Sequence, residues 1–475
     1  MRSAMNARAD SLQERFERQL AAQRADPYPD LAVRRRRLSA LEALVGDNLE
    51  RVAQAVNADF GRRPERETRL LEGFPALSSI RHARRRVGRW MRPRRRFASR
   101  WLLPGRSMLL PQPLGVVGIV SPWNYPLLLT VSPLAAALAA GNRAMLKLSE
   151  VTPLTSAELA ALFAKYFSED EVTAVQGDAA AGAAFSSLPF GHLLFTGAGR
   201  IGREVMRAAA ESLTPVTLEL GGKSPVIVAP QYPLEHAAER VMLGKCMNAG
   251  QTCVAPDYLL VPRGSEAAAL EALRAATDRL YPDMPFNKDY AHVVSERHFQ
   301  RLGAMLDEAR ARGAEIVALS SSMSQPDAAR RRFPPLAVVN PPEELKLMRE
   351  EIFGPLLPVI GYERIEEAVA FVNARERPLA LYLFDRDAAR VGRVLRQTLS
   401  GGVTVNDVFL HVAEESLPFG GVGASGMGAY HGRAGFETFS KLRPVFLQSR
   451  WATTWMLNPP YGGRFDRLLR WMLRR

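Results

Sequence analysis

The sequence has very little cysteine, which excludes two classes of protein. Only Cys246 and Cys253 occur among its 475 residues. Small secreted scaffolds depend on several disulfide bridges, and a structural zinc site takes four ligands, so two cysteines cannot by themselves build either. We therefore expect neither a disulfide framework nor a metal site.

The chain also lacks an export signal and an uninterrupted apolar span. Residues 1–20 alternate charged and apolar side chains at helical spacing, without an apolar signal core. Residues 107–142 carry no charge and are long enough to cross a bilayer. Five prolines interrupt them, however, and a lipid-facing helix could not satisfy its backbone through so many breaks. We expect buried strand, loop and helix there, and a cytoplasmic protein.

Length and composition indicate a large globular protein, and most simply an enzyme. The chain is 47% hydrophobic, and 35 glycines and 33 prolines are spread along it, which excludes a disordered or fibrous protein. The formal net charge is +14, from 63 Lys and Arg against 49 Asp and Glu. Basic runs at 34–37, 84–86, 92–96 and 330–332 flank helical stretches without interleaved aromatics. This pattern favours solvent-exposed helix faces over a nucleic-acid-binding site. Attraction of the positive charge to anionic substrates or membranes remains an alternative.

The order of predicted elements favours a parallel α/β architecture. Residues 10–90 show the spacing of amphipathic helices, with Leu38, Leu41, Val45 and Leu49 as one apolar row. A hairpin is expected over residues 96–112, with Pro104-Gly105 as the turn between two short apolar strands. Strands and helices then alternate, and a second alternating section covers about 224–405. The first section has strands at 115–120, 143–147 and 192–195 and helices at 132–140 and 155–166.

Three short segments contain residues suited to nucleophilic catalysis. Cys253 stands among small residues and amides, which suits an accessible thiol nucleophile, although a buried core cysteine is the more common alternative. Glu219 lies between two leucines, where desolvation raises a carboxyl pKa and suits a general base; a partnered structural glutamate is the alternative. Asn124, between two prolines, could stabilise an oxyanion or simply form a turn.

A glycine-containing turn over residues 195–202 follows an apolar strand and opens a helix. Such a helix start is a plausible phosphate site, because its backbone N–H groups are free. The glycine spacing is not that of the usual dinucleotide fingerprint, so this signal is weak in isolation.

Taken together, the motifs resemble those of the aldehyde dehydrogenase superfamily over about residues 34–448, in the family's order. Within it, residues 252–258 and 425–432 resemble the class 3 branch, and residues 406–419 resemble bacterial coniferyl aldehyde dehydrogenases. The matching motifs are Pro122-Trp-Asn-Tyr-Pro, Lys147-Leu-Ser-Glu150, Phe195-Thr-Gly, Glu219-Leu-Gly-Gly-Lys, Gly250-Gln-Thr-Cys253, Glu351-Ile-Phe-Gly-Pro355 and Pro418-Phe-Gly-Gly-Val-Gly.

The resemblance implies oxidation of an aldehyde to its acid through a cysteine thioester, with NAD as cofactor and NADP as a further candidate. It implies that Cys253 is the nucleophile, that Asn124 and the Cys253 N–H hold the oxyanion, and that Glu219 activates the hydrolytic water. The implied cofactor contacts are Lys147 and Glu150 at the adenosine ribose, Gly197, Ala198, Ile201 and Gly202 near the pyrophosphate, and Glu351 and Phe353 at the nicotinamide. The expected substrate pocket is formed by Trp123, Tyr125, Thr252 and Phe419. Ala198 and Leu148 depart from the residues common in relatives, Ser or Asn and Pro respectively.

The fold that the resemblance implies has a Rossmann-like cofactor domain, an α/β catalytic domain and a small oligomerisation hairpin, in a homodimer. The expected division is N-terminal helices of the cofactor domain 1–93, hairpin 94–112, NAD-binding domain 113–218, catalytic domain 219–411, a return to the cofactor domain with an oligomerisation strand 412–449, and a basic tail 450–475.

Alternatives remain for the substrate, the reaction and the tail. The preferred substrate is an aromatic or cinnamyl aldehyde such as coniferyl aldehyde, and the alternative is a medium- or long-chain aliphatic aldehyde. A CoA-acylating dehydrogenase and a non-catalytic basic binding protein on the same fold are the rival functions. Residues 464–475 predict an amphipathic helix that docks on the enzyme itself or lies on a membrane surface. Its apolar face comprises Phe465, Leu468, Leu469, Met472 and Leu473, and its basic face Arg464, Arg467, Arg470 and Arg474.

Overall fold

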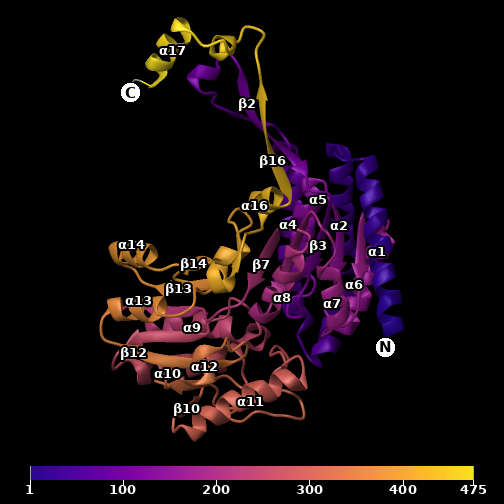
Figure 1. Cartoon of the computed structure of the whole chain (residues 1–475). Coiled ribbons are helices and arrows are strands. Elements are labelled where there is room, and N and C mark those ends of the chain that lie inside the picture. The colour runs from indigo at the N-terminus through magenta and orange to yellow at the C-terminus, as the bar shows by residue number, and fades with distance from the viewer. Residues whose placement is uncertain (1, 474–475) are drawn as a thin grey trace.

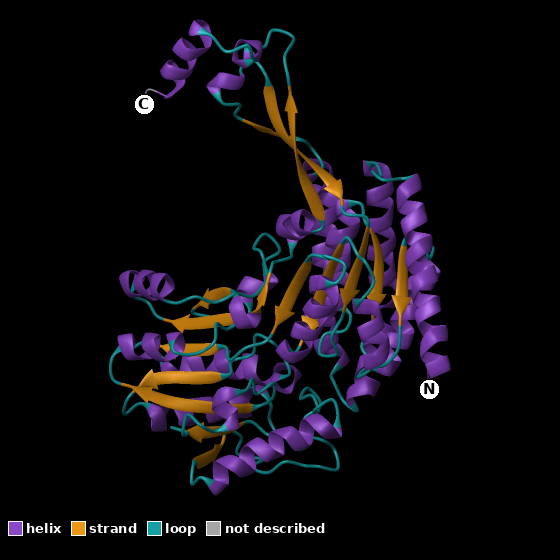
Figure 2. Ribbon diagram, in the orientation of Figure 1, coloured by secondary structure: helices purple, strands orange, loops and turns teal. Residues whose placement is uncertain are grey.

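The computed structural model describes the backbone of residues 2–473 and the side chains from residue 12 to residue 473. Two large sheets lie side by side, and a three-stranded arm projects away from them (Figures 1 and 2). The α/β fold class expected from the sequence is confirmed. Within the described residues, no helix has both the length and the apolar character needed to cross a membrane.

The first sheet has six strands in the order β15-β7-β6-β3-β4-β5, parallel except for β15. Its strands are β3 (Val116–Val120), β4 (Arg143–Lys147), β5 (Val172–Val175), β6 (His192–Gly197), β7 (Val216–Leu220) and β15 (Gly426–Met427). β4 is buried along its whole length, as expected when helices cover both faces of a parallel sheet.

Helices from the N-terminal third, from the crossovers and, with α16, from near the C-terminus cover the six-stranded sheet (Figure 1). These are α1 (Arg2–Ala25), α2 (Leu31–Phe60), α3 (Glu65–Thr68), η1 (Arg69–Gly73), α4 (Phe74–Trp90), α5 (Leu128–Ala140), α6 (Pro153–Tyr166), α7 (Ala179–Ser186), α8 (Gly199–Ala210) and α16 (Gly432–Thr438). α2 packs on α4, α5 and α6. It begins where the Asp30 side chain accepts the Val33 N–H (2.8 Å), and it ends at Gly61, whose φ of 73° suits glycine.

The second sheet has seven strands in the order β10-β11-β12-β9-β8-β13-β14, parallel except for the β10–β11 pair. Its strands are β8 (Pro225–Val228), β9 (Tyr258–Pro262), β10 (Glu315–Ala318), β11 (Leu336–Val339), β12 (Leu356–Tyr362), β13 (Ala380–Phe384) and β14 (Gly402–Val405). The helical segments between and after them are α9 (Leu234–Cys246), η3 (Met247–Gly250), α10 (Glu266–Leu280), α11 (Glu296–Ala311), α12 (Lys346–Arg349), α13 (Ile365–Asn373), α14 (Ala388–Gln397), α15 (Leu410–Ala413) and η4 (Gly423–Ser425).

The chain changes sheet between Leu220 and Pro225. Glu219 therefore lies on the last parallel strand of the six-stranded sheet, two residues before the connection to the other sheet. The expected boundary between the cofactor and catalytic domains, at residue 219, falls inside β7. It was placed at the start of the Glu219 motif, and this motif begins within the strand.

The arm consists of β1 (Arg94–Arg96), β2 (Arg106–Pro113) and β16 (Ser440–Leu447), all antiparallel. The expected hairpin forms, and a turn lies at Pro104-Gly105, where the Gly105 N–H donates to the Leu102 carbonyl (2.8 Å). The expectations that this turn joins the strands directly and that both strands are apolar are wrong. The first strand is basic, and residues 97–105 form a longer connection that contains η2 (Arg100–Leu102). Because the arm projects from the body, charged side chains on this strand remain exposed.

The tail forms η5 (Thr454–Leu457) and α17 (Gly463–Leu473) at the tip of the arm, remote from the two large sheets (Figure 1). Trp471 contacts Trp101 edge-on, with 4.7 Å between ring centroids. The helix thus docks on the arm through a residue outside the predicted apolar face, and Leu473 of that face is exposed. Arg474 and Arg475 lie outside the described residues.

The interpretation of the 34–37 run as a solvated face is wrong for two of its arginines. Arg34 and Arg37 are buried on α2. Arg34 donates to the carbonyls of Ala139 (3.0 Å) and Ala140 (2.7 Å), which are free because α5 ends there. Arg37 forms an ion pair with Glu171 (3.0 Å).

Candidate active site

A cleft of about 1360 Å³ lies where the two sheets meet. It is bordered by the loops that follow β3 and β4, the end of β7 and the start of α8 from one sheet, and by loops of the other. Ligand sites in open α/β folds form at such carboxyl ends of parallel strands. Most residues singled out from the sequence line it, namely Trp123, Asn124, Lys147, Glu150, Gly197, Ala198, Ile201, Glu219, Cys253, Glu351 and Phe353.

Cys253 reaches the cleft because the segment before it takes an unusual backbone path. After α9 ends, Asn248, Ala249 and Gly250 have φ angles of 51°, 50° and 74°. Left-handed backbone is unfavourable for residues other than glycine and persists only where surrounding contacts impose it. Gln251 supplies such contacts, because its side chain donates to the Asn248 carbonyl (2.9 Å) and accepts the Val294 N–H (2.9 Å).

Glu219 and Cys253 form a carboxylate–thiol pair. Glu219 is buried, and burial raises its pKa to about 7, which the nearby Cys253 thiol and Thr196 hydroxyl offset only in part. Among the described residues, neither Glu219 carboxylate oxygen has a hydrogen-bond partner of normal geometry. Burial, together with the charges of Glu219 and Glu351, raises the pKa of the Cys253 thiol well above its usual value. The thiol is thus protonated at rest and lies beside a carboxylate that can accept its proton.

Asn124 presents its amide beside the Cys253 loop. The Asn124 Nδ2 donates to the Gln251 carbonyl (3.2 Å). An amide nitrogen carries two N–H groups, and this hydrogen bond uses one of them among the described residues, which leaves one for a ligand. The Asn124 backbone carbonyl accepts from Arg63 Nη1 (2.8 Å) and from Asn248 Nδ2 (3.1 Å). The residue is therefore held by both its backbone and its side chain.

The other end of the cleft suits a dinucleotide. No side chain caps the start of α8, where Ala198 is the N-cap, so the first N–H groups of this 12-residue helix are available to an anion. Open space of at least 4 Å surrounds the position of a Cβ at Gly199. Lys147 Nζ is buried and donates to the Leu148 carbonyl (2.8 Å) and Glu150 (3.4 Å).

Glu351 is a buried carboxylate with an unsatisfied oxygen at the same cleft. Its Oε1 has no hydrogen-bond partner among the described residues, and burial with the nearby Asp257 charge raises its pKa to about 8. A Cβ at Gly221 would overlap this carboxylate. The Ile352 N–H donates to Asp257 Oδ2 (2.9 Å), and Arg301 holds the Glu351 carbonyl (3.3 Å). A fixed acceptor of this kind fits a ribose hydroxyl.

Four predicted residues do not line the cleft. The Tyr125 hydroxyl and Thr252 Oγ1 lie 2.6 Å apart, buried behind the surface, and brace the two loops. Phe419 is buried against His431 and Tyr430, at ring centroid distances of 5.3 and 5.6 Å. Gly202 faces Leu220, and a Cβ there would lie 2.8 Å from its side chain, so this glycine allows close packing of α8 on β7. Their adjacency to site motifs in the sequence did not show which way the side chains point.

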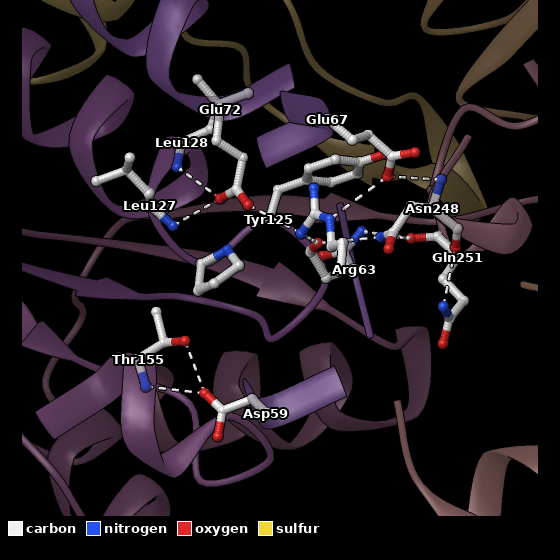
Figure 3. A network of polar contacts seen from close by, with 12 residues as sticks. Asp59, Arg63, Glu67, Glu72, Tyr125, Leu127, Leu128, Thr155, Asn248 and Gln251 are labelled. Carbon is white, nitrogen blue, oxygen red and sulfur yellow. Dashed lines mark hydrogen bonds and ion pairs between the residues drawn. The ribbon is translucent and has the colours of Figure 1, made fainter. Parts of the chain in front are cut away.

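A buried cluster of Arg63, Glu67 and Glu72 was missed by the sequence analysis (Figure 3). Its residues stand in a stretch rich in charge, which resembles a solvated helix end. Their burial depends on hydrogen bonds with backbone groups of Asn124 and Asn248, and both of these residues lie far away in the sequence. No local signal reveals such partners.

The chain resembles known proteins along nearly all of its length. A family model described as the aldehyde dehydrogenase family matches residues 3–445. A probable coniferyl aldehyde dehydrogenase of Pseudomonas aeruginosa is 49% identical, over 97% of this chain and 96% of the relative. The coniferyl aldehyde dehydrogenase of a Pseudomonas species is 44% identical with the same coverage. The substrate-bound structure of Staphylococcus aureus AldH has a TM-score of 0.92 and 34% identity, covering 97% of this chain and 99% of that one.

We predict that iodoacetamide labels Cys253 at least about 100-fold faster than Cys246 in the folded protein at pH 8. The pKa values of both thiols are raised by burial, so the difference comes from access: Cys253 lines the cleft, whereas Cys246 is fully buried. Peptide mass spectrometry over time measures both rates, and labelling in denaturant is the control for intrinsic reactivity. Equal rates in the folded protein would show that the cleft does not expose Cys253.

Proposed function

Because the chain belongs to the aldehyde dehydrogenase family, we propose that it oxidises cinnamyl-type aromatic aldehydes, coniferyl aldehyde among them, to carboxylic acids. The observation that carries the reaction is the convergence of Asn124, Glu219 and Cys253 on one cleft from three distant segments. A binding protein that merely retained the fold would have no use for this combination. The relatives named for coniferyl aldehyde, at 44–49% identity, support the substrate class.

In the proposed reaction, the Cys253 thiol transfers its proton to Glu219 and the thiolate sulfur attacks the carbonyl carbon. The Asn124 amide and the Cys253 N–H stabilise the oxyanion that forms, and one such donor contributes about 2.7–4 kcal/mol. A nicotinamide cofactor, when bound, supplies the hydride acceptor. Loss of hydride from the attacked carbon leaves the acyl group on Cys253 Sγ as a thioester, and Glu219 releases its first proton to solvent. Glu219 then takes a proton from the water that attacks the thioester, which gives the acid and releases Cys253 Sγ as the leaving group.

The cleft supports the cofactor assignment through several of its own groups. The uncapped start of α8 at Gly197, Ala198 and Ile201 suits the pyrophosphate, with Gly202 allowing α8 to pack close to β7. Glu351 offers its free oxygen to the nicotinamide ribose, and Phe353 lies beside it at the cleft. Structures of related dehydrogenases include one from Mycobacterium tuberculosis, 28% identical, described in complex with NAD⁺.

We predict that kcat/KM is higher with NAD than with NADP. In the proposed placement, Lys147 and Glu150 meet the adenosine ribose, so a 2′-phosphate would approach the Glu150 carboxylate. Lys147 attracts the same phosphate and limits the preference, so we expect about a tenfold difference. Initial rates at varied concentrations of each cofactor measure it, and equal kcat/KM values would contradict the proposal.

We predict that Glu219→Gln slows thioester hydrolysis by about 100-fold or more, while acylation slows less. A burst of NADH should then precede a slow steady state. In the wild type the hydrolytic rate should rise with pH through about 7, because the base acts only when ionised and the pKa of Glu219 is about 7. Stopped-flow absorbance and a pH profile test this.

Full turnover by Glu219→Gln would instead assign that carboxylate a structural role. A CoA-acylating enzyme would need no such base, so adding CoA and identifying the product as acid or acyl-CoA separates the two reactions.

We predict that coniferyl aldehyde and cinnamaldehyde exceed acetaldehyde in kcat/KM by about tenfold or more, because an aromatic substrate buries more apolar surface on binding. Trp123 lines the cleft and contacts Phe353 edge-on, with centroids 5.3 Å apart, and offers an aromatic wall. The test is a steady-state panel that also includes decanal. A higher kcat/KM for decanal than for coniferyl aldehyde would favour the aliphatic alternative.

The arm supports a homodimer. β16 pairs with β2 on one side only and leaves an eight-residue edge open, which is a surface that natural proteins usually cover. Light scattering should then give twice the 52.5 kDa chain mass.

We assign α17 to docking on the arm, because Trp471 packs on Trp101. Binding of the full-length protein to anionic liposomes would contradict that assignment.

A further inference from the structure

Arg63 is a fully buried cation that contacts the backbone of Asn124, a residue that lines the cleft (Figure 3). Its Nη1 donates to the Asn124 carbonyl (2.8 Å) and forms an ion pair with Glu72 Oε1 (2.9 Å). The guanidinium also lies over the Tyr125 ring, with 4.7 Å from Cζ to the ring centroid. Burying a charge is costly unless it is paired, so these contacts hold the side chain in one position.

The same cluster contacts both loops that form the candidate oxyanion site. Glu72 Oε2 accepts the N–H groups of Leu127 (2.8 Å) and Leu128 (3.3 Å), just after Asn124. Glu67 Oε1 lies 3.5 Å from Arg63 Nε and accepts the Asn248 N–H (2.9 Å), at the start of the left-handed turn before Cys253. Arg63 is therefore one link between the Asn124 loop and the Cys253 loop, which it reaches through Glu67, and it adds to the contact between the Tyr125 and Thr252 hydroxyls.

The two loops also meet directly, but through few groups. Asn248 Nδ2 donates to the Asn124 carbonyl (3.1 Å), the same oxygen that Arg63 holds. Asn124 Nδ2 donates to the Gln251 carbonyl (3.2 Å). Without Arg63, the strained turn at Asn248 would be anchored to the opposite loop only through neutral side-chain hydrogen bonds and packing.

We propose that Arg63 is a positioning residue that sets the distance between the two oxyanion donors, the Asn124 amide and the Cys253 N–H. It does not line the cleft, so it acts through the two loops and not through direct contact with a bound ligand. Because transition-state stabilisation depends on donor placement, a shift of about 1 Å can reduce the rate by about 100-fold. The inference rests on the proposed function, which assigns the oxyanion to these two donors.

The test separates oxyanion formation from access to the thiol. Hydrolysis of 4-nitrophenyl acetate by Cys253 passes through an oxyanion, whereas alkylation of Cys253 by iodoacetamide does not. In Arg63→Met we expect ester hydrolysis and aldehyde oxidation to fall by about 10- to 100-fold, with alkylation within about twofold of the wild type. Cys253→Ala provides the blank for ester hydrolysis.

Arg34 offers a matched control, because it is also a buried arginine that holds backbone carbonyls, at the far end of α5. Arg34→Met should lower Tm without changing the ratio of ester hydrolysis to alkylation. Should Arg63→Met not fold, Arg63→Lys keeps the charge but loses the planar fork, and we expect a smaller fall in the same ratio.

The proposal would be overturned if the ratio of ester hydrolysis to alkylation is unchanged in the folded Arg63 variant. It would also be overturned if this ratio falls equally in Arg34→Met. The wild type is assayed with aldehyde first. If it oxidises none, the proposed function fails, while the ratio of ester hydrolysis to alkylation still judges the role of Arg63.

Discussion

The hydrogen bond from the Asn124 side chain to the Gln251 carbonyl, 3.2 Å long, marks the constraint on which the site depends. It joins a loop of the six-stranded sheet to the segment that follows α9, between residues 127 positions apart in the chain. The proposed reaction needs its nucleophile and oxyanion donor within a few ångströms of each other, and contacts of this kind hold the two loops together at the junction of the sheets. The left-handed turn at Asn248–Gly250 and the buried Arg63 cluster lie at this same junction.

Burial of carboxylates is the second feature that shapes the chemistry. Glu219 and Glu351 both lie in the cleft, and burial raises their pKa values to about 7 and about 8. An isolated buried carboxylate is costly to ionise, which keeps these groups near the point of proton exchange at neutral pH. Burying these carboxylates lowers the stability of the folded protein. The large apolar cores on either side of the cleft offset this cost and hold the strands that position the carboxylates.

The arm places an open strand edge and aromatic tail residues away from the two large sheets (Figure 1). Trp451, Trp455 and Trp471 are all exposed in the single chain. Exposed apolar surface of this kind is typical of interaction sites, and here it lies on a different part of the molecule from the candidate site.

Local sequence determined much of this protein. Apolar runs such as 116–120 predicted the buried strands, and the motifs around Asn124, Glu219 and Cys253 identified the candidate chemistry, because these depend on neighbours along the chain. The direction of the Tyr125 and Phe419 side chains and the burial of Arg34 and Arg63 were decided only by tertiary structure. Their partners are the Thr252 hydroxyl, the Tyr430 ring and backbone groups of α5 and the Asn124 loop, which lie far away in sequence. Whether a charged or aromatic side chain points into a core or a cleft depends on which distant groups surround it, and local spacing carries no information about them.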